Sequence, residues 1–405
     1  MEPGRQLTRR RFLRQAAAAG AAAPLIAGAR VFGANERITM GCIGVGGRGQ
    51  SDMNDFLRFD DIQVVAVCDV VEENRLNAKR RVDKRYGNED CAAYNDFRRI
   101  IERDDIDTVL VATPDHWHAV IAVAAMQNGK DVFCEKPETL TIREGRLMTE
   151  AARRHNRILS GGSQRVWEDY NWFHRMVRGG AIGRVQEVWV NVGGPSDACF
   201  LPPEPVPAGL DWDLWLGPAP WAPFNKGRLN FRPWRDYSGG GMTDWGCHGF
   251  GGALFACELH PTGPVEIIPP DGQDHPRLTY VFANGVRIYH GGGWGGILSF
   301  KGSDGEIPAR GEEERERPKP PDIEIPNYRG QGGITGDFLH CVKTREIPFR
   351  DIEVAHRTAT HSHLGNLAYW LNRPLKWNPE AERFVNDPDA NRWLDREKRE
   401  PWGLA

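Results

Sequence analysis

The chain has 405 residues, of which 40% are hydrophobic and 26% are charged. This composition excludes a largely disordered chain, and the length favours two domains that share a cleft. The formal net charge is −3, but residues 1–30 contain six arginines and one glutamate, so the remainder carries −8. An acidic body argues against nucleic acid as the main partner.

Residues 1–34 predict a twin-arginine export signal followed by a short linker. The segment Thr8–Arg14 contains the paired arginines, an alanine-rich stretch covers Gln15–Ile26, and Ala27–Ala29 matches a small-residue cleavage site. The apolar stretch is too short to span a bilayer comfortably. We therefore expect a protein that is exported to the periplasm in the folded state and has no membrane partner afterwards.

Residues 35–160 begin with the signature of a dinucleotide-binding domain. A buried strand over Arg37–Ile43 leads into a loop in which Gly44, Gly46 and Gly49 have the spacing G-x-G-x-x-G, and a helix follows. In such loops the glycines permit a tight turn, a close approach of pyrophosphate and helix packing on the strand. We expect the loop, including Gly47 and Arg48, to hold the phosphates at the helix start.

Asp69 is the expected ribose-binding residue. It ends a second buried strand, Ile62–Cys68, at about the distance from the glycine loop at which a ribose-binding carboxylate belongs. A carboxylate there would repel a 2′-phosphate, so Asp69 favours NAD, with NADP as the alternative. The structural alternative is that Asp69 merely ends the strand or caps a helix.

Two further strands complete the pattern of a parallel, doubly wound sheet. Asp107–Pro114 precedes a helix over Ala119–Gln127, and Lys130–Pro137 ends in a charged turn. Ligands of such sheets lie at the carboxyl ends of the strands. The residues that we expect there are Gly44, Asp69, Thr113 and Lys136.

Several motifs together resemble the Gfo/Idh/MocA family of oxidoreductases. They are Gly44–Gly49, Thr113–His118, Glu135–Pro137, Asp211–Pro218, Gly241–His248 and Pro379–Phe384, and they cover nearly everything after the signal. The resemblance implies an α/β fold in which residues 161–405 form a second domain with a large open mixed or antiparallel sheet, a homo-oligomer, and a carbohydrate or polyol substrate. Strand-like runs at Val185–Val192, Arg277–Phe282 and Gly285–His290, without intervening helices, agree with such a sheet.

The resemblance also assigns roles in the cleft. Lys136 would exchange the proton of the substrate hydroxyl, which requires burial or neighbouring positive charge to favour its neutral form. Asp244 and His248 match a D-x-x-x-H element, and on one helix this spacing would let the carboxylate orient the imidazole. Many relatives carry an acidic residue where this chain has Gly251, so we expect a lost substrate contact there.

The remaining cofactor contacts are expected from Thr113, Pro114, His118 and Glu135. No metal is expected, because the eight cysteines contain no C-x-x-C pair and His116 and His118 lack a third ligand.

Two enzymatic reactions and one alternative remain open. An exported enzyme lacks a free nicotinamide pool, so its cofactor should stay bound and be regenerated in place. The bound cofactor could couple oxidation of one sugar to reduction of another, or cleave a glycoside by oxidation, elimination and reduction. The alternative is a sugar-binding or cofactor-binding protein without turnover.

Overall fold

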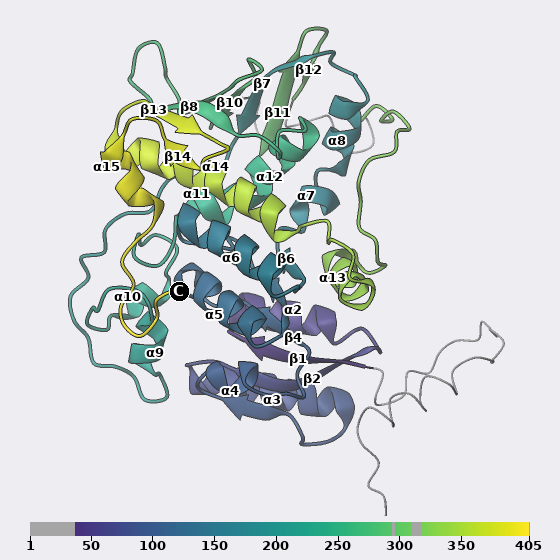
Figure 1. The fold of residues 1–405 in the computed structure, drawn as a ribbon, viewed down its shortest axis with the longest axis vertical. Helices are drawn as coiled ribbons and strands as arrows, with labels where there is room; N and C mark the ends of the chain where they lie inside the picture. Colours follow the sequence, from purple (N-terminus) through teal and green to yellow (C-terminus); the bar gives the residue numbers. More distant parts are fainter. Residues whose placement is uncertain (1–36, 294–295, 309–316, 405) are drawn as a thin grey trace, which may run out of the picture. The chain divides into compact units, whose positions relative to one another are not determined.

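The computed structural model describes residues 37–293, 296–308 and 317–404, so the predicted export signal lies outside the described residues. Within them the chain forms the expected α/β fold with two sheets (Figure 1). None of the helices in this part of the chain has the length and apolar character that a membrane crossing requires.

The first sheet is the predicted doubly wound one. Its strands run in the order β3-β2-β1-β4-β5-β6, and every neighbouring pair is parallel. This order places the switch point between β1 and β4, where dinucleotides bind in such sheets. The strands are β1 (Ile38–Ile43), β2 (Ile62–Cys68), β3 (Ala92–Tyr94), β4 (Thr108–Val111), β5 (Asp131–Cys134) and β6 (Leu159–Gly161).

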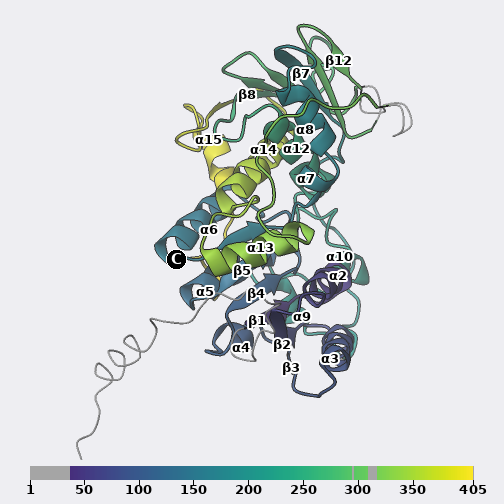
Figure 2. The ribbon, with the colours of Figure 1, turned by 90° about the vertical axis from the view of Figure 1, so that its right-hand side faces the viewer.

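Helices cover this sheet on both faces, because its central strands are apolar on both sides. The helices from the same part of the chain are α2 (Gly47–Phe56), α3 (Glu72–Tyr86), α4 (Arg98–Ile101), α5 (Asp115–Gln127) and α6 (Ile142–Arg154). A later helix, α13 (Gly333–Thr344), also packs here, with Phe338 against Phe56 and Phe133 (Figure 2). The first sheet therefore recruits a helix that follows the second sheet in the chain.

The second sheet is mixed, as expected, in the order β12-β11-β7-β10-β9-β8-β13-β14. The pair β7–β10 is parallel and the other neighbouring pairs are antiparallel. The strands are β7 (Val185–Val190), β8 (Pro264–Ile268), β9 (Thr279–Phe282), β10 (Arg287–His290), β11 (Leu298–Gly302), β12 (Glu306–Ile307), β13 (Leu375–Asn378) and β14 (Arg383–Phe384).

The expectation that no helices interrupt the strands of the second domain is wrong. Between β7 and β8 the chain forms α9 (Trp212–Leu216), α10 (Lys226–Leu229), α11 (Gly241–Asp244) and α12 (Gly246–Ala256). The other helices of this half are α7 (Arg165–Glu168), α8 (Asn171–Arg178), α14 (Ile352–Leu371), α15 (Pro388–Asn391) and the short 3₁₀ helix η1 (Arg392–Leu394). Helices α12 and α14 are buried along most of their length, so their sequences lack the polar stripe by which surface helices are recognised.

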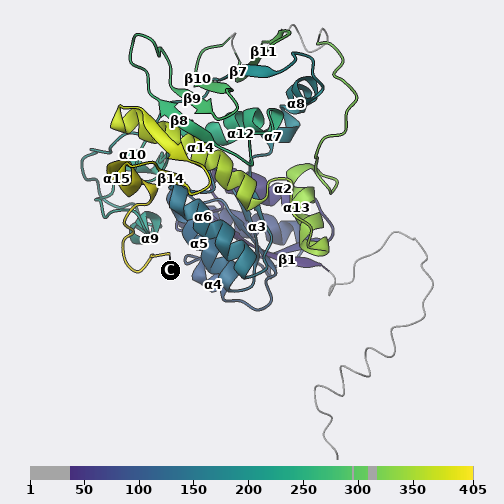
Figure 3. The same ribbon diagram turned by 45° about the horizontal axis from the view of Figure 1, so that its top comes forward.

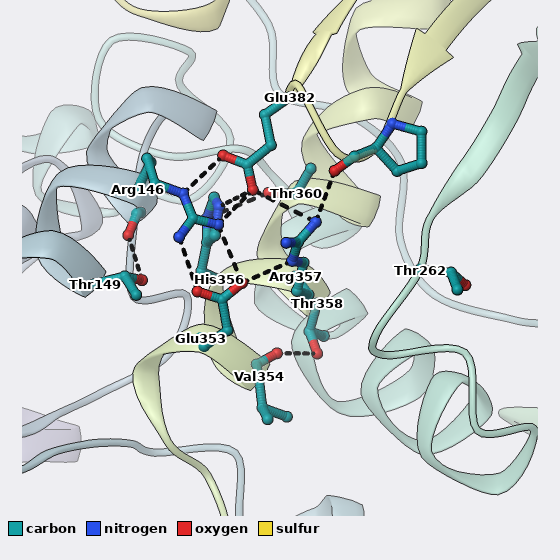
Figure 4. Close-up of polar contacts among 12 residues, drawn as sticks. Arg146, Thr149, Thr262, Glu353, Val354, His356, Arg357, Thr358, Thr360 and Glu382 are labelled. Carbon is teal, nitrogen blue, oxygen red and sulfur yellow. Dashed lines mark hydrogen bonds and ion pairs between the residues drawn. The ribbon is translucent and has the colours of Figure 1, made fainter. Parts of the chain in front are cut away.

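Helix α14 lies between the two sheets, against both α6 and α12 (Figure 3). At this contact Arg146 of α6 binds Glu353 of α14 and Glu382, with nitrogen–oxygen distances of 2.8 and 2.6 Å (Figure 4). His356 Nε2 lies 2.8 Å from Glu382 as well. Burial opposes the charged form of Glu353, but hydrogen bonds from Arg146 and Arg357 outweigh it and lower the pKa to about 2. Arg146 thus joins the layers electrostatically.

We predict that Arg146→Met lowers the free energy of unfolding by about 2 kcal/mol at neutral pH, because two partly buried carboxylates lose their shared cation. A carboxylate with a lowered pKa stabilises the fold above its unfolded value of about 4.3, and this contribution is lost as the pH falls. For Glu353 the loss is complete once the pH passes below about 2. Urea denaturation across this acid range should show a shallower pH dependence for the variant than for the wild type. The exposed Arg143→Met on the same helix is the control, and equal effects of both substitutions would contradict the prediction.

Candidate active site

The glycine loop after β1 has the geometry that a dinucleotide requires. Gly44 has a φ of +79°, and a Cβ atom there would lie 2.7 Å from the Ala112 backbone. A Cβ on Gly49 would lie 1.8 Å from the Gly44 carbonyl oxygen, so only glycine allows α2 to pack this closely. Helix α2 begins at Gly47 without a side-chain cap, which leaves its first N–H groups for a phosphate.

Asp69 is held in position at the carboxyl end of β2. Its carboxylate accepts hydrogen bonds from the Val71 N–H at 2.8 Å and from Asn74 Nδ2 at 3.4 Å. Burial raises the pKa of Asp69 above its usual value, although these hydrogen bonds favour the charged form. The side chain is thus fixed with respect to the backbone, as a residue that reads a ribose must be.

A pocket of about 510 Å³ runs along the carboxyl ends of the strands and brings most of the predicted residues together. Of the residues predicted to contact the cofactor or the substrate, Gly49, Asp244 and His248 are absent from its lining. The predicted residues that line it are Gly44, Gly46, Gly47, Arg48, Asp69, Thr113, Pro114, His118, Glu135 and Lys136.

His118 and Glu135 act on the loop that carries Lys136. The ring nitrogens of His118 lie 2.8 Å from the Pro137 carbonyl and 2.7 Å from the Thr113 carbonyl. Burial lowers the pKa of His118 to about 4, so its neutral ring donates to one of these oxygens. Glu135 accepts hydrogen bonds from Arg48 Nε at 2.9 Å and from the Lys136 backbone N–H at 3.1 Å. Both residues therefore fix the turn after β5.

Lys136 reaches from the first sheet to the second half of the chain. Its Nζ donates to Asp244 Oδ1 at 2.5 Å and to the Asp244 carbonyl at 2.9 Å. Burial opposes the charge on Asp244, but the attraction of Lys136 and of Arg232 outweighs it and lowers the pKa of Asp244. Both partners are nearly buried, with side-chain exposures of 13% for Lys136 and 14% for Asp244.

The interpretation that Asp244 orients His248 on one helix is wrong. Asp244 ends α11 and His248 belongs to α12, so Trp245 separates two helices and the carboxylate is directed to Lys136. The ring of His248 instead lies edge-on to Trp245, and its Nδ1 has no hydrogen-bond partner among the described residues. Burial, assisted by Lys136 and nearby arginines, lowers the pKa of His248 to about 2, so the imidazole is neutral at working pH.

The expectation that Gly251 removes a substrate contact is also wrong. Gly251 is buried in α12, and a Cβ there would lie 2.9 Å from Val166 and 3.3 Å from Thr358, with Arg350 beyond at 3.7 Å. A side chain at this position would enter the packed interior. The glycine therefore carries no information about the substrate.

A segment of the second half covers the dinucleotide pocket, a position that the Asp211–Pro218 motif did not predict. We call residues 209–216 the cover segment; its backbone pairs with the loop after Asp69 through Gly209, Leu210 and Asp211. Asn95 donates to Asp211 at 2.8 Å, and Trp117 Nε1 donates to the carbonyl of Leu214 at 3.0 Å. Leu214 and Trp215 line the pocket.

The C-terminal segment reinforces this cover from outside. Arg399 Nε donates to the Gly217 carbonyl at 2.9 Å, and buried Trp402 packs on Trp117 with ring centroids 4.8 Å apart. In Figure 1 this yellow segment runs from α15 past α9 and ends beside α5. Pocket and cover are therefore connected to both halves of the chain.

Comparison with known proteins identifies the family. Residues 38–163 match the Gfo/Idh/MocA description "Oxidoreductase family, NAD-binding Rossmann fold", and residues 194–404 match "Oxidoreductase family, C-terminal alpha/beta domain". The chain belongs to this family. It is therefore an NAD-binding oxidoreductase of the Gfo/Idh/MocA type.

Individual relatives match a smaller part of the chain than the two family descriptions do. A glycosyl hydrolase family 109 protein of Saccharopolyspora erythraea is 37% identical over 166 residues, 38% of this chain and 34% of that protein. An alpha-N-acetylgalactosaminidase of Shewanella oneidensis is 35% identical over 126 residues, 29% of this chain and 27% of the enzyme. The chain thus spans about a third of the curated relatives that it matches. A crystal structure of an aldose-aldose oxidoreductase from Caulobacter crescentus has the same fold, with TM-score 0.59, 20% identity, and coverage of 84% of this chain and 99% of that chain.

The pocket fits NAD on its own geometry. The glycine loop leaves no room for a side chain at Gly44 and Gly49, a carboxylate lies at Asp69, and the buried Thr113 hydroxyl oxygen has no hydrogen-bond partner among the described residues. Gly44–Gly49 would hold the pyrophosphate and Asp69 a ribose. Among the described residues no cluster of three or more His, Cys, Asp or Glu side chains could hold a metal ion.

We predict that Trp402→Ala releases NAD at least about tenfold faster than the wild type, because a loss of 1.4 kcal/mol in holding the cover segment corresponds to this factor. The measurement is the dinucleotide that remains on the protein during extended dialysis. Trp221→Ala is the matched control, since Trp221 lies in the same half of the chain but is 70% exposed. Equal retention by both variants would show that the cover does not restrain the cofactor.

Proposed function

We propose that this enzyme oxidises a secondary alcohol of a sugar, polyol or glycoside with bound NAD, and that Lys136 accepts the hydroxyl proton. The contact between Lys136 and Asp244 carries the proposal. Oxidation of an alcohol removes a hydride from carbon and a proton from oxygen, so the proton acceptor must lie beside the dinucleotide. Lys136 meets this requirement, because it lines the dinucleotide pocket.

The residues of the chain support the steps as follows. When bound, NAD supplies the hydride acceptor. The substrate hydroxyl passes its proton to the neutral form of Lys136, and the ionised Asp244 stabilises the ammonium that results. His248 is buried and neutral, and its Nδ1 has no hydrogen-bond partner among the described residues, so we propose that it hydrogen-bonds to the substrate without carrying charge.

We also propose that NAD stays bound between turnovers and that the protein works in the periplasm after twin-arginine export. The cover segment and the C-terminal segment support retention, since both contact the first half of the chain and Leu214 and Trp215 of the cover segment line the pocket. The paired arginines within Thr8–Arg14 support export. Retention and export agree, because a periplasmic enzyme that released NAD would lose it.

A second reaction is favoured by the similarity to a glycosyl hydrolase family 109 protein and to an alpha-N-acetylgalactosaminidase. Oxidation at C3 of a glycoside makes the hydrogen at C2 acidic. Loss of that proton to solvent expels the aglycone from C1 as an anion, which takes up a proton from solvent. Water then adds to the double bond between C1 and C2, and return of the hydride to C3 restores the alcohol. The net reaction is hydrolysis, and Lys136 can hold the C3 hydroxyl proton throughout. The chain's lack of a carboxylate at Gly251 does not contribute to this argument.

A protein that binds sugar or NAD without turnover is the alternative to both reactions. The arrangement of Lys136 and Asp244 argues against it, because burying an ion pair costs desolvation energy that binding alone does not require. Substitution of Lys136 separates the two possibilities, since only an enzyme has turnover to lose.

We predict that Lys136→Ala forms oxidised product at least about 100-fold more slowly than the wild type, because the proton acceptor is lost. Bound NAD and sugar affinity should stay within a factor of about three, a difference below 1 kcal/mol. Product is measured by mass spectrometry after incubation with sugars and glycosides, and affinity by calorimetry. Lys376→Ala, which removes an exposed lysine of β13, is the control for loss of a lysine. Undiminished turnover in Lys136→Ala would contradict the role of Lys136 as proton acceptor.

For the second reaction we predict deuterium uptake. Cleavage of 4-nitrophenyl N-acetyl-α-D-galactosaminide in D₂O should release nitrophenol and leave deuterium at C2 of the sugar, because the C2 proton exchanges with solvent. No NADH should accumulate, since the hydride returns to the sugar. Nitrophenol release without deuterium at C2 would point to direct hydrolysis and remove oxidation from this reaction.

A further inference from the structure

Arg232 contacts the reaction centre, and no sequence motif pointed to it. It lies in the loop after α10 and lines the dinucleotide pocket. Its Nε is 3.2 Å from Asp244 Oδ1, the same oxygen that Lys136 Nζ approaches at 2.5 Å. The guanidinium also lies 4.8 Å from the ring centroid of Phe231, which helps to hold it. Two cations therefore share one carboxylate oxygen.

This sharing matters when Lys136 becomes neutral. If Lys136 were the only partner of Asp244, loss of its proton would leave a nearly buried carboxylate without compensation, which is costly. Arg232 keeps its charge at every working pH and remains beside Asp244. Asp244 therefore keeps a cationic partner when Lys136 is neutral.

We propose that Arg232 is a positioning residue for proton transfer at Lys136: it compensates Asp244 whenever Lys136 is neutral. The inference rests on the proposed function, because it assigns Arg232 a part in the same proton transfer. Arg232 acts through Asp244, which it contacts directly.

Of the titratable groups near Lys136, Asp244 is the carboxylate that contacts it. Burial raises the pKa of Asp52 on α2 to about 8, and those of Asp115 on α5 and Glu138 after β5 to about 7. Glu135, next to Lys136 in the chain, pairs with Arg48. The uncharged groups that interact with Lys136 are His118 on α5 and Cys247 and His248 on α12, because burial lowers the pKa of each histidine and raises that of the thiol.

The direction of the pH effect follows from these charges. A proton acceptor works in its neutral form, so the rate rises with pH as Lys136 loses its proton. Removal of the Arg232 charge leaves Asp244 free to stabilise the ammonium form, which moves this rise to higher pH. The side chain of Arg232 is 48% exposed, so solvent screens part of its charge. We therefore expect the pH at which the rate rises to shift by about one unit, which is a small shift for a charge at this distance.

The test compares Arg232→Gln, Arg232→Lys and the wild type as full-length holoenzymes. For Arg232→Gln the ascending limb of the kcat/KM profile should shift to higher pH by about one unit. The rates on the acid side of the limb should be about tenfold lower than in the wild type and should recover at high pH. Arg232→Lys should restore most of the wild-type profile. Arg81→Gln, on the exposed side of α3, removes the same charge outside the pocket lining and should leave the limb in place.

A second readout does not need turnover. Acetylation of Lys136 by limiting acetic anhydride, measured by mass spectrometry as a function of pH, follows its neutral form. The labelling midpoint should move upward in Arg232→Gln and return in Arg232→Lys. An unmoved midpoint, or a rate loss that is uniform across pH, overturns the inference. A moved midpoint in a protein that oxidises no sugar supports the role of Arg232 and rejects the proposed function.

Discussion

The ion pair between Lys136 and Asp244 joins the two halves of the described chain at the dinucleotide pocket. Lys136 follows β5 of the first sheet, and Asp244 ends α11 beside the second sheet. Neither half contains both groups, so this ion pair exists only when the halves are packed together. The contacts of α14 with α6, and of Arg146 with Glu353 and Glu382, keep that packing in place.

Burial gives this pair its chemical character. Asp244 stays ionised because cations contact it, whereas burial raises the pKa of Asp52, Asp115 and Glu138 toward or above neutrality. Two buried histidines, His118 and His248, are neutral for the same reason. The site therefore contains many titratable groups and few full charges, and in such surroundings one carboxylate has a strong influence on a lysine.

Local patterns predicted the nucleotide half well. The strands that end at Cys68 and before Thr113 are continuous apolar runs, and Gly44, Gly49 and Asp69 lie where short-range motifs place them. Residues 35–160 as a separate domain stay a prediction, although α13 packs on the same sheet. These successes share one cause, because each depends on residues that are close in the sequence.

The remaining features depend on contacts between distant residues. The spacing of Asp244 and His248 predicted one helix. In the structure α11 ends at Asp244 and α12 begins after Trp245, and the Asp244 carboxylate contacts Lys136. Gly251 faces the interior rather than the substrate, which no single sequence reveals. The Asp211–Pro218 motif did not predict that the cover segment lies over the pocket, and Arg232 lies in no recognised motif, since the loop geometry that brings both to the pocket is set by packing of the whole chain.

The most direct test of the account is a single-turnover experiment on protein purified without added nucleotide. The holoenzyme is mixed with a panel of aldoses, polyols and glycosides, and the absorbance of reduced nicotinamide is followed. At least one of these compounds should produce the absorbance of reduced nicotinamide from the bound dinucleotide, transiently if the hydride is returned. A protein that carries NAD and binds a sugar, yet shows no reduction at any time, would contradict it.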